Sequence, residues 1–384
     1  MKILIIRNFP SYMAVINATY NIQELGLAKA LVRKGHVCDI LFWTDREEKN
    51  VIVPVDGIGE VRVFYRHGKT LLKNTIYTGC ETLFADYDIL QPCEYNQMQS
   101  WLLAGKYPDK TVIYHGPYYC DFNRRYNLMC SIFDKLFLKR YIVKGTKFLV
   151  KSELAETFLA DKGIDPRNIA TVGVGVDIQM LTSPKGTCSE PLYQTMEKDQ
   201  GRLKLLYIGR FEERRNIPFL LDIFEKVLQQ NKDARLYMIG SGDREYMEMV
   251  FSYMDKLSVR DRVIWQEQVE QRYLAEIYAQ ADFFLLPTKY EIFGMVLPEA
   301  MYYGAVVLTT KNGGSATLIQ NGENGFILDE DHAQPWAECI LRMHQDRTGM
   351  RRIRTAAAAM SDSFTWDALS VRFIEQYEAR LNES

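Results

Sequence analysis

Short apolar runs alternate with stretches of helical periodicity along the first part of the chain. One such helix carries Ile22, Leu25, Ala28 and Leu31 at helical spacing, and Gly35 follows as a stop signal. Strands separated by helices predict a parallel, doubly wound sheet. The predicted strands are residues 3–6, 37–42, 61–65, 87–90, 111–114 and 147–150.

The second part of the chain repeats this plan from residue 203. A strand and a polar loop precede an amphipathic helix at residues 218–230. We therefore predict an α/β fold with two doubly wound, Rossmann-like domains that face a central cleft. The further strands are residues 203–209, 234–239, 262–265, 282–286 and 305–309.

The domain boundaries follow from a polar segment between the two halves. Residues 179–202 hold Pro184 and Pro191 and lack sustained periodicity, which predicts a linker. Residues 1–178 would then form the N-terminal Rossmann-like domain, and residues 203–365 the C-terminal Rossmann-like domain. We expect the helix in residues 366–384 to return to the N-terminal domain.

Composition adds constraints on compartment and partners. The chain has 384 residues, 47% of them hydrophobic and 25% charged, which is typical of a globular protein with more than one core. A formal charge of −2 gives no general attraction to nucleic acid, and we expect no nucleic-acid partner. Seven scattered cysteines form no metal-binding motif and suggest reduced thiols. No apolar run reaches the length of a membrane span, and MKILII suits a buried strand, so we expect a cytoplasmic protein.

The most informative motif is EIFGMVLPE at residues 291–299. An apolar run at residues 281–287 precedes it, and a helical pattern begins at Met295. Glu291 therefore falls in a strand-to-helix loop, at the sheet edge where ligands bind in such folds, and Glu299 falls inside the helix. Carboxylates in these places would meet sugar or ribose hydroxyls rather than phosphate.

A second charged loop, GRFEERRN at residues 209–216, follows the first strand of the second domain. Arg210 and Arg215 place two guanidinium groups there, which can clamp a diphosphate. The neighbouring Glu212 and Glu213 favour the alternative of a solvated charged turn. Both interpretations remain open on the loop alone.

His115 ends the predicted strand TVIYH of the first domain. A histidine at this end of a parallel strand lies on the ligand side of the sheet, where it can donate a hydrogen bond or transfer a proton. The alternative is a structural histidine in a loop.

Residues 124–147, from Arg124 to Lys147, mix basic and apolar side chains. This segment predicts either a basic amphipathic surface for anionic lipid or a phosphorylated acceptor, or an ordinary helix with a solvated basic face. The basic residues are Arg124, Arg125, Lys135, Lys139, Arg140, Lys144 and Lys147.

Taken together, these motifs resemble the retaining nucleotide-sugar glycosyltransferases of family 4, which have the two-domain GT-B fold. The resemblance covers nearly the whole chain. It is carried by GRFEERRNI, then ADFFLLPTKYEIFGMVLPEA, then GG before NGENGF, in that order. VGVGVD at residues 172–177 and FTW at residues 364–366 resemble the family's segments before the hinge and before the returning helix.

The resemblance implies that residues 1–178 form the acceptor domain and residues 203–365 the nucleotide-sugar donor domain, and it implies roles for the candidate residues. Arg210 and Arg215 would neutralise the diphosphate as its bond to the sugar breaks, and preorganised charge of this kind is usually the largest catalytic contribution. Glu291 would lie beside the donor sugar, and His115 would contact that sugar. No metal or other cofactor is expected. The donor-binding residues would be Gly209, Val269 beside the base, Phe293, Gly294 and Met295 through their backbone, and Glu299 at the ribose.

The sequence departs from the family's pattern in three features, which involve four positions. Arg215 stands where a lysine is usual, which replaces a point charge by a planar fork. Ala18 and Thr19 occupy the place of paired glycines in the first loop, so close backbone approach to phosphate is not expected there. Thr317 replaces a frequent glutamate.

The leading hypothesis is therefore retaining transfer of a sugar from a nucleotide diphosphate sugar, UDP-linked rather than GDP-linked, to a hydroxyl acceptor. The acceptor would be a glycan or a lipid-linked glycan of the cell surface, met at the inner face of the cytoplasmic membrane through residues 124–147. Two alternatives remain: an epimerase of the same fold, and a non-catalytic subunit that binds a nucleotide sugar.

Overall fold

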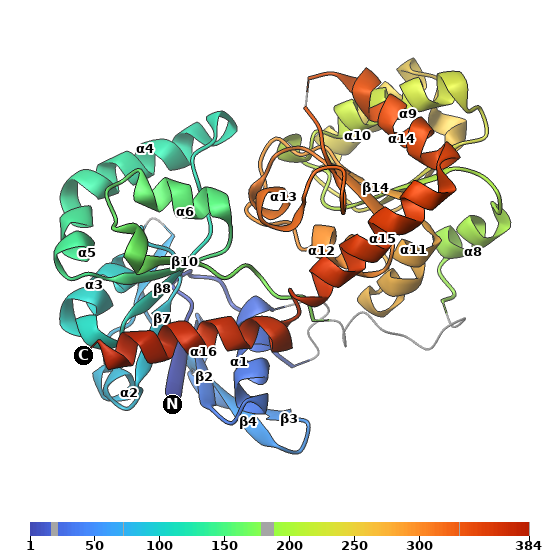
Figure 1. The fold of residues 1–384 in the computed structure, drawn as a ribbon. Helices are drawn as coiled ribbons and strands as arrows, with labels where there is room; N and C mark the ends of the chain where they lie inside the picture. The colour runs from blue at the N-terminus through green and yellow to red at the C-terminus, as the bar shows by residue number, and fades with distance from the viewer. Residues whose placement is uncertain (17–21, 72, 178–187, 330, 384) are drawn as a thin grey trace. The chain divides into compact units, whose positions relative to one another are not determined.

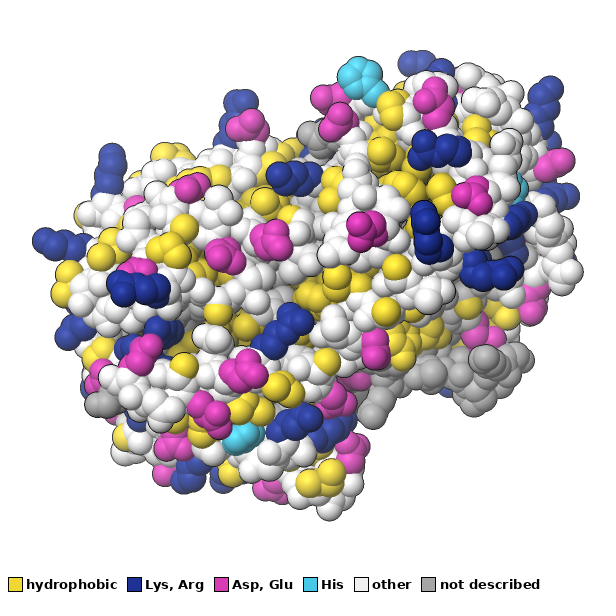
Figure 2. All heavy atoms as spheres, in the orientation of Figure 1, with side chains coloured by type: hydrophobic (Ala, Val, Ile, Leu, Met, Phe, Trp, Pro, Cys, Tyr) yellow, Lys and Arg dark blue, Asp and Glu magenta, His cyan; other side chains and the backbone are white. Residues whose placement is uncertain are grey.

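The chain folds into two compact units. The structure, a computed structural model, describes all residues except 17–21, 72, 178–187, 330 and 384. Unit 1 comprises Met1–Gly175 together with Thr365–Ser384, and unit 2 comprises Val176–Phe364. Figure 2 shows basic and acidic side chains distributed over the visible surface, in line with the small net charge.

Unit 1 is built on strands in the order β3-β4-β2-β1-β7, continued by β8-β9-β10, and all of them except β3 are parallel. Two parallel bridges, Leu90–Thr111 and Cys93–Tyr114, join the two sets at β7 and β8. β1 is apolar and buried along nearly its whole length, as expected for a strand covered on both faces. The strands are β1 (Lys2–Ile6), β2 (Val37–Trp43), β3 (Lys49–Val55), β4 (Gly59–Arg66), β7 (Ile89–Pro92), β8 (Val112–His115), β9 (Lys147–Val150) and β10 (Ile169–Thr171), with the separate pair β5 (Lys69–Leu71) and β6 (Asn74–Ile76).

The edge of this sheet differs from the purely parallel arrangement predicted from the sequence. β3 pairs with β4 in antiparallel register, and Asp56 and Gly57 turn the chain with φ of 48° and 69°. Two successive positive φ angles characterise the tight hairpin turn that Asp-Gly favours. The Asp-Gly pair was therefore the available signal for this hairpin.

The helices of unit 1 include the C-terminal helix α16, which packs against α1 (Figure 1). Trp366, the first residue of α16, is buried, and its indole lies against Gly26 and Gly175. A Cβ on Gly26 would come within 2.2 Å of the ring, and one on Gly175 within 2.3 Å. The helices are α1 (Gln23–Arg33), α2 (Glu81–Ala85), α3 (Met98–Lys106), α4 (Arg124–Phe133), a π-helical turn η3 (Asp134–Leu138), α5 (Lys139–Val143), α6 (Glu153–Ala160) and α16 (Trp366–Asn382).

Unit 2 contains a six-stranded parallel sheet in the order β13-β12-β11-β14-β15-β16. The chain builds outward from β11 to β12 and β13, then returns to place β14 on the other side of β11. This reversal defines a topological switch point, where such sheets bind ligands beyond their carboxyl edge. The strands are β11 (Lys204–Ile208), β12 (Arg235–Ile239), β13 (Val263–Gln266), β14 (Phe283–Leu286), β15 (Val306–Thr309) and β16 (Phe326–Ile327).

The helices of unit 2 include one that the sequence reading missed. Residues 191–198, part of the expected linker, form α8, because Pro191 suits a first helical turn and Leu192 and Met196 bury one face. The amide of Leu192 donates to the side chain of Gln266 at the end of β13, 3.1 Å away. The helices are α8 (Pro191–Lys198), α9 (Ile217–Gln230), α10 (Arg244–Lys256), α11 (Leu274–Gln280), α12 (Val296–Tyr302), α13 (Gly313–Leu318), α14 (Ala333–Gln345) and α15 (Arg347–Asp362).

The α/β class and both parallel sheets agree with the sequence prediction. Each predicted strand overlaps an observed one, and the observed ends differ by a few residues. Within the part of the chain that the structure describes, no helix has the length and apolar character needed to cross a membrane.

The contact between Trp366 and Gly26 predicts whether a substitution of Gly26 stabilises or destabilises the protein. Alanine is ordinarily better than glycine inside a helix by about 0.5–1 kcal/mol. At Gly26, however, the new methyl would overlap an indole that Gly175 blocks on its other side, and overpacking costs roughly 1–3 kcal/mol. We expect Gly26→Ala to lower the midpoint of thermal unfolding in calorimetry.

The double-mutant cycle with Trp366→Leu provides the control. Removing the indole should abolish most of the cost of Gly26→Ala, although Trp366→Leu itself destabilises unit 1. A Gly26→Ala variant more stable than the parent protein would contradict the packing described here.

Candidate functional site

The loops after β11 and β14 lie side by side at the switch point of unit 2. These two strands are hydrogen-bonded neighbours in parallel register, so their carboxyl ends meet at the same edge of the sheet. The β11 loop carries Arg214 and Arg215, and the β14 loop carries Glu291. The position that topology marks for a ligand is therefore occupied by charged side chains.

Glu291 is shared by two guanidinium groups. Its Oε2 atom lies 3.0 Å from Nη1 of Arg214 and also contacts Nη1 of Arg215. The glutamate is only 8% exposed, so the three charges meet largely out of water. Burial opposes ionisation of the Arg214 guanidinium, but Glu291 and Glu212 outweigh it and raise its pKa.

The backbone fixes the two loops to each other. The carbonyl oxygen of Arg214 accepts hydrogen bonds from the hydroxyl of Thr288 and the amide of Lys289, both at 2.8 Å. Nη1 of Arg214 donates in turn to the carbonyl of Tyr290 at 3.2 Å. Asn216 then takes a left-handed conformation, with φ of 54°, between this loop and α9. The position of Arg214 therefore depends on main-chain contacts as well as on its charge.

The structure pairs Arg215 with Arg214 rather than with Arg210. Arg210 is exposed, and the described residues give its guanidinium no ion pair. Sequence reasoning missed Arg214, although it stands next to Arg215 in the same charged loop. The placement of Arg210 in a phosphate clamp stays a prediction.

Three consecutive amides follow Glu291 without a partner. Among the described residues, no group accepts a hydrogen bond from the N–H of Phe293, Gly294 or Met295. Gly294 makes the turn with φ of 75°, and a Cβ on Gly314 would lie 1.7 Å from the Phe293 carbonyl oxygen. Backbone donors held in this way can bind sugar hydroxyls or phosphate oxygens, the role expected for these residues.

Gly209 has a packing role in the neighbouring loop. Its amide donates to the carbonyl of Ile239 at 3.0 Å, and its own carbonyl oxygen would lie 1.9 Å from a Cβ on Gly240. The Gly209 N–H is therefore already used within the protein. Glycines at these points let the loops after β11 and β12 touch through their backbones.

Glu299 lies inside α12 and is 5% exposed. The hydroxyl of Tyr278 donates to its Oε2 atom at 3.0 Å. Burial raises the pKa of Glu299 to about 7, and the Tyr278 hydrogen bond only partly opposes this shift. Glu299 is thus a buried carboxyl group that accepts a hydrogen bond from Tyr278, and its contact with a ribose stays a prediction.

The remaining predicted positions of the donor side are less constrained. Val269 lies in the loop after β13 and is partly exposed. The hydroxyl of Thr317 donates to the carbonyl of Gly313 within α13, at 3.0 Å. Ala18 and Thr19 lie outside the described residues.

His115 ends β8 in unit 1 and is completely buried. Its Nδ1 atom lies 2.7 Å from Oε2 of Glu94, which follows β7 and also accepts from the amide of Gly116 at 3.1 Å. Lys151 lies 3.6 Å from the other oxygen of Glu94. Glu94 has a φ of 61°, which is uncommon for a residue with a side chain. Sequence reasoning missed this glutamate.

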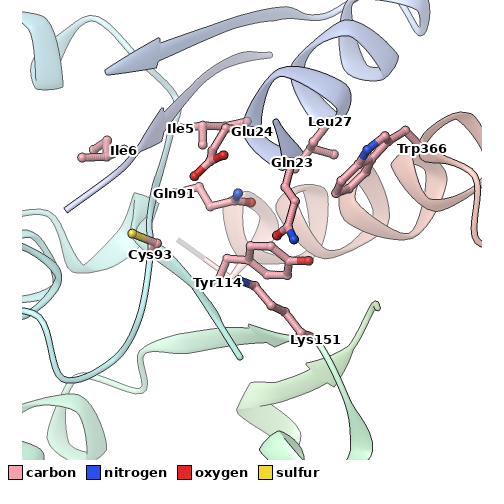
Figure 3. Close-up of a pocket in the computed structure, with 10 residues that line it drawn as sticks. All are labelled: Ile5, Ile6, Gln23, Glu24, Leu27, Gln91, Cys93, Tyr114, Lys151 and Trp366. Carbon is pink, nitrogen blue, oxygen red and sulfur yellow. The ribbon is translucent and has the colours of Figure 1, made fainter. Parts of the chain in front are cut away.

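A pocket of unit 1 lies beside this group (Figure 3). Lys151 and Cys93 line it together with Glu24, which forms an ion pair with Arg7 at 2.7 Å. Trp366 closes one side of the pocket, so α16 contributes to its wall. Lys151 therefore connects the pocket to Glu94.

The described residues contain no cluster of histidine, cysteine, aspartate and glutamate suited to a metal ion. The charged groups that meet at the switch point are Arg214 and Arg215 with Glu212 and Glu291.

Comparison with known proteins relates unit 2 to a protein family. Residues 192–360 match the family model "Glycosyl transferases group 1". The matched residues cover most of unit 2. The match includes the loops of Arg214, Glu291 and Gly294, so the resemblance inferred from the motifs is confirmed.

Curated relatives and solved structures extend the likeness. The D-inositol 3-phosphate glycosyltransferase of Xylanimonas cellulosilytica is 28% identical over 243 residues, which cover 62% of this chain and 58% of the relative. The chain thus spans about half the length of the curated relatives it matches.

Two solved structures match the whole fold. Sucrose-phosphate synthase from Thermosynechococcus elongatus has a TM-score of 0.71 at 17% identity and covers both chains completely. The Anabaena protein HepE in complex with UDP has a TM-score of 0.72 at 14% identity, covering 99% of this chain and 100% of HepE. At such identities the likeness establishes the fold, which is of the GT-B type with two Rossmann-like domains.

The buried Glu299 of unit 2 predicts a pH dependence of stability. Its pKa is about 7 in the folded protein and has an ordinary value of 4.5. The folded state therefore binds this proton more tightly than the unfolded chain. The resulting stabilisation is fully present below pH 4.5 and is lost as the pH rises through about 7. At 1.36 kcal/mol per pKa unit the loss amounts to roughly 3 kcal/mol.

We expect Glu299→Gln to remove this pH-dependent contribution to the free energy of unfolding. The melting temperature of the variant, measured against pH, should rise relative to the parent protein between mildly acidic and mildly alkaline solution. Glu323→Gln, at an exposed position, is the matched control and should follow the parent curve. Parallel curves for Glu299→Gln and the parent would show that Glu299 does not titrate in this range.

Proposed function

We propose that the protein transfers a sugar from a nucleotide diphosphate sugar to a hydroxyl acceptor, with retention of the anomeric configuration. The observation that carries this proposal is the junction of Arg214 and Arg215 with Glu291, next to the open amides of residues 293–295. This junction lies at the switch point of a group 1 glycosyltransferase domain.

The geometry suits a donor with a diphosphate. Nε of Arg215 is buried and makes no hydrogen bond with the described residues, so this guanidinium retains a donor for an anion. The amides of residues 293–295 add donors for sugar hydroxyls or the distal phosphate. Charge neutralisation by arginine then takes the place of a metal ion. HepE has been solved with UDP and with UDP-glucose, which favours a uridine nucleotide here.

The proposed reaction needs no side-chain nucleophile. The bond between the anomeric carbon and the diphosphate oxygen breaks, while the acceptor oxygen forms its bond on the same face of the sugar. The acceptor's proton passes to the leaving diphosphate. The Glu291 carboxylate contacts two guanidinium groups, which makes it a poor nucleophile and supports this front-side route over a covalent intermediate.

The acceptor side of the proposal rests on the surface formed by α4, η3 and α5. Several apolar side chains are exposed there, including Leu128 at 62%, Leu136 at 67% and Val143 at 71%. Asp134, the acidic residue of this helical run, is an ion-pair partner of Lys162. Exposed basic residues flank the apolar ones: Arg124, Arg125, Lys135, Lys139 and Lys144.

Apolar side chains that alternate with unpaired basic ones are typical of a helix that lies on an anionic membrane. In Figure 2 yellow and dark-blue side chains intermingle over the part of unit 1 that carries α4 and α5. We infer that this surface contacts anionic lipid and that the acceptor is a glycan linked to such a lipid.

Alanine substitutions test the donor site. We expect Arg215→Ala and Glu291→Ala each to lower kcat/KM by about 10²–10³-fold, the usual cost of removing one preorganised group that stabilises developing charge. The donor is first identified by a thermal-shift screen of nucleotide diphosphates and their sugars, because a ligand that binds only the folded protein raises its stability. Transfer is then measured with that donor and a panel of hydroxyl acceptors.

Arg244→Ala is the matched control, because this arginine is highly exposed and, among the described residues, pairs only with Glu248 on its own helix. It should transfer at the parent rate. The assignment would be refuted if the alanine variants of Arg210, Arg215 and Glu291 all transferred sugar at the parent rate. Inversion of the anomeric configuration in the product would refute the retaining mechanism.

Charge reversal tests the membrane contact. Each basic residue near an anionic surface contributes about 1 kcal/mol. The combined substitutions Arg124→Glu, Arg125→Glu and Lys139→Glu should therefore weaken binding to phosphatidylserine-containing vesicles at least ~100-fold. Arg140 is left unchanged, because its guanidinium stacks 3.2 Å from the centre of the Trp101 ring.

The control reverses three exposed basic residues of unit 2, Lys232, Arg244 and Lys256, with the same change in net charge. Vesicle flotation should separate the two triple variants. Equal binding of both to the vesicles would contradict a membrane role for α4 and α5.

A further inference from the structure

The loops after β7 and β8 place a carboxylate against the buried His115. Nδ1 of His115 lies 2.7 Å from Oε2 of Glu94, and neither side chain is more than 7% exposed. Glu94 reaches this position with a φ of 61°, a conformation that side-chain-bearing residues rarely adopt. Strained backbone of this kind persists where the surroundings fix it and is concentrated at functional sites.

Aromatic neighbours hold the imidazole ring in place. Phe158 stacks on it with a centroid separation of 5.5 Å, and Tyr95 meets it edge-on at 5.1 Å. The opposite ring atom, Nε2, is buried and has no hydrogen-bond partner among the described residues. A buried polar atom without a partner is costly, so a group that pairs with Nε2 is expected from outside the protein.

The state of Glu94 decides what Nε2 can offer. Burial opposes ionisation of Glu94, but Lys151, His115 and the Gly116 amide together lower its pKa. An ionised carboxylate can only accept hydrogen bonds. Oε2 of the ionised Glu94 therefore accepts from both the Gly116 amide and the Nδ1 atom of His115, so Nδ1 carries a proton. In the neutral form of the ring, the lone pair therefore lies on Nε2.

We infer that Glu94 is a positioning residue that holds His115 as the Nδ1–H tautomer, so that Nε2 accepts a hydrogen bond from a substrate hydroxyl. The identity of that substrate as a sugar rests on the proposed function. This arrangement also favours a substrate hydroxyl over an anionic group. A substrate carboxylate or phosphate at the same place would be repelled by the Nε2 lone pair and by the Glu94 carboxylate behind the ring.

Nitrogen NMR of the histidine side chains tests the tautomer directly. In ¹⁵N-labelled protein under mildly alkaline conditions, His115 should show a protonated Nδ1 and an unprotonated Nε2. The chain has five histidines, and loss of one signal set in His115→Gln assigns the resonance. An Nε2–H tautomer in the parent protein would overturn the inference. The measurement needs no turnover, so it remains decisive if the protein transfers no sugar.

Two substitutions of Glu94 distinguish its role as a hydrogen-bond acceptor for His115 from its role in filling space. Glu94→Leu removes the acceptor and should release the tautomer and lower kcat/KM about 10–100-fold, as loss of a partner that orients a histidine commonly does. Glu94→Gln can keep its amide oxygen toward Gly116 and His115. It should therefore retain the Nδ1–H tautomer and restore most of the activity.

Asp39→Asn is the matched control for a buried carboxylate of the same unit. Asp39 accepts hydrogen bonds from Tyr87 and Arg62, away from His115. Its substitution should lower the melting temperature without changing the His115 tautomer or kcat/KM at a temperature where the variant is folded. If Glu94→Leu also lowers only the melting temperature, Glu94 is structural and the inference fails.

Discussion

The central constraint of unit 2 is a single carboxylate oxygen shared by two guanidinium groups. Arg214 and Arg215 are adjacent in sequence, and adjacent side chains converge on one atom only if the backbone turns between regular elements. The short η5 turn (Glu213–Arg215) and the left-handed Asn216 supply that turn. Thr288 then fixes the loop to the carboxyl end of β14. Because β11 and β14 are parallel neighbours, the loops that carry the two arginines and Glu291 meet at the same edge of the sheet. The geometry of the site therefore depends on the strand order of the sheet.

The charges at this junction nearly balance each other. Arg214 contacts both Glu212 and Glu291, and Arg215 contacts Glu291 while its Nε lies 3.8 Å from Glu212. Removing one member of such a buried set leaves another charge uncompensated, which is why single substitutions are expected to be severe. In the proposed function a bound diphosphate would add negative charge, which we propose Arg210 and the amides of residues 293–295 offset.

The sequence predicts what is local and much less of what depends on sheet order. Apolar runs located β11 and β14, and the glycine turn after Glu291 indicated Gly294, because these signals span only a few residues. Arg214 was missed because spacing in the loop does not reveal which guanidinium turns inward. Glu94 was missed because its contact with His115 joins loops of neighbouring strands 21 positions apart in the chain. The Asp56-Gly57 hairpin, in contrast, carried a readable local signal.

Trp366 gives unit 1 a discontinuous sequence. The indole that packs against Gly26 and Gly175 comes from a helix whose residues follow the whole of unit 2 in the chain. During synthesis the sheet of unit 1 emerges from the ribosome long before α16, and domains otherwise fold in order from the N-terminus. Unit 1 must therefore wait, with the α1 side of its core uncovered, while unit 2 is made. A helix that is translated after unit 2 therefore completes unit 1.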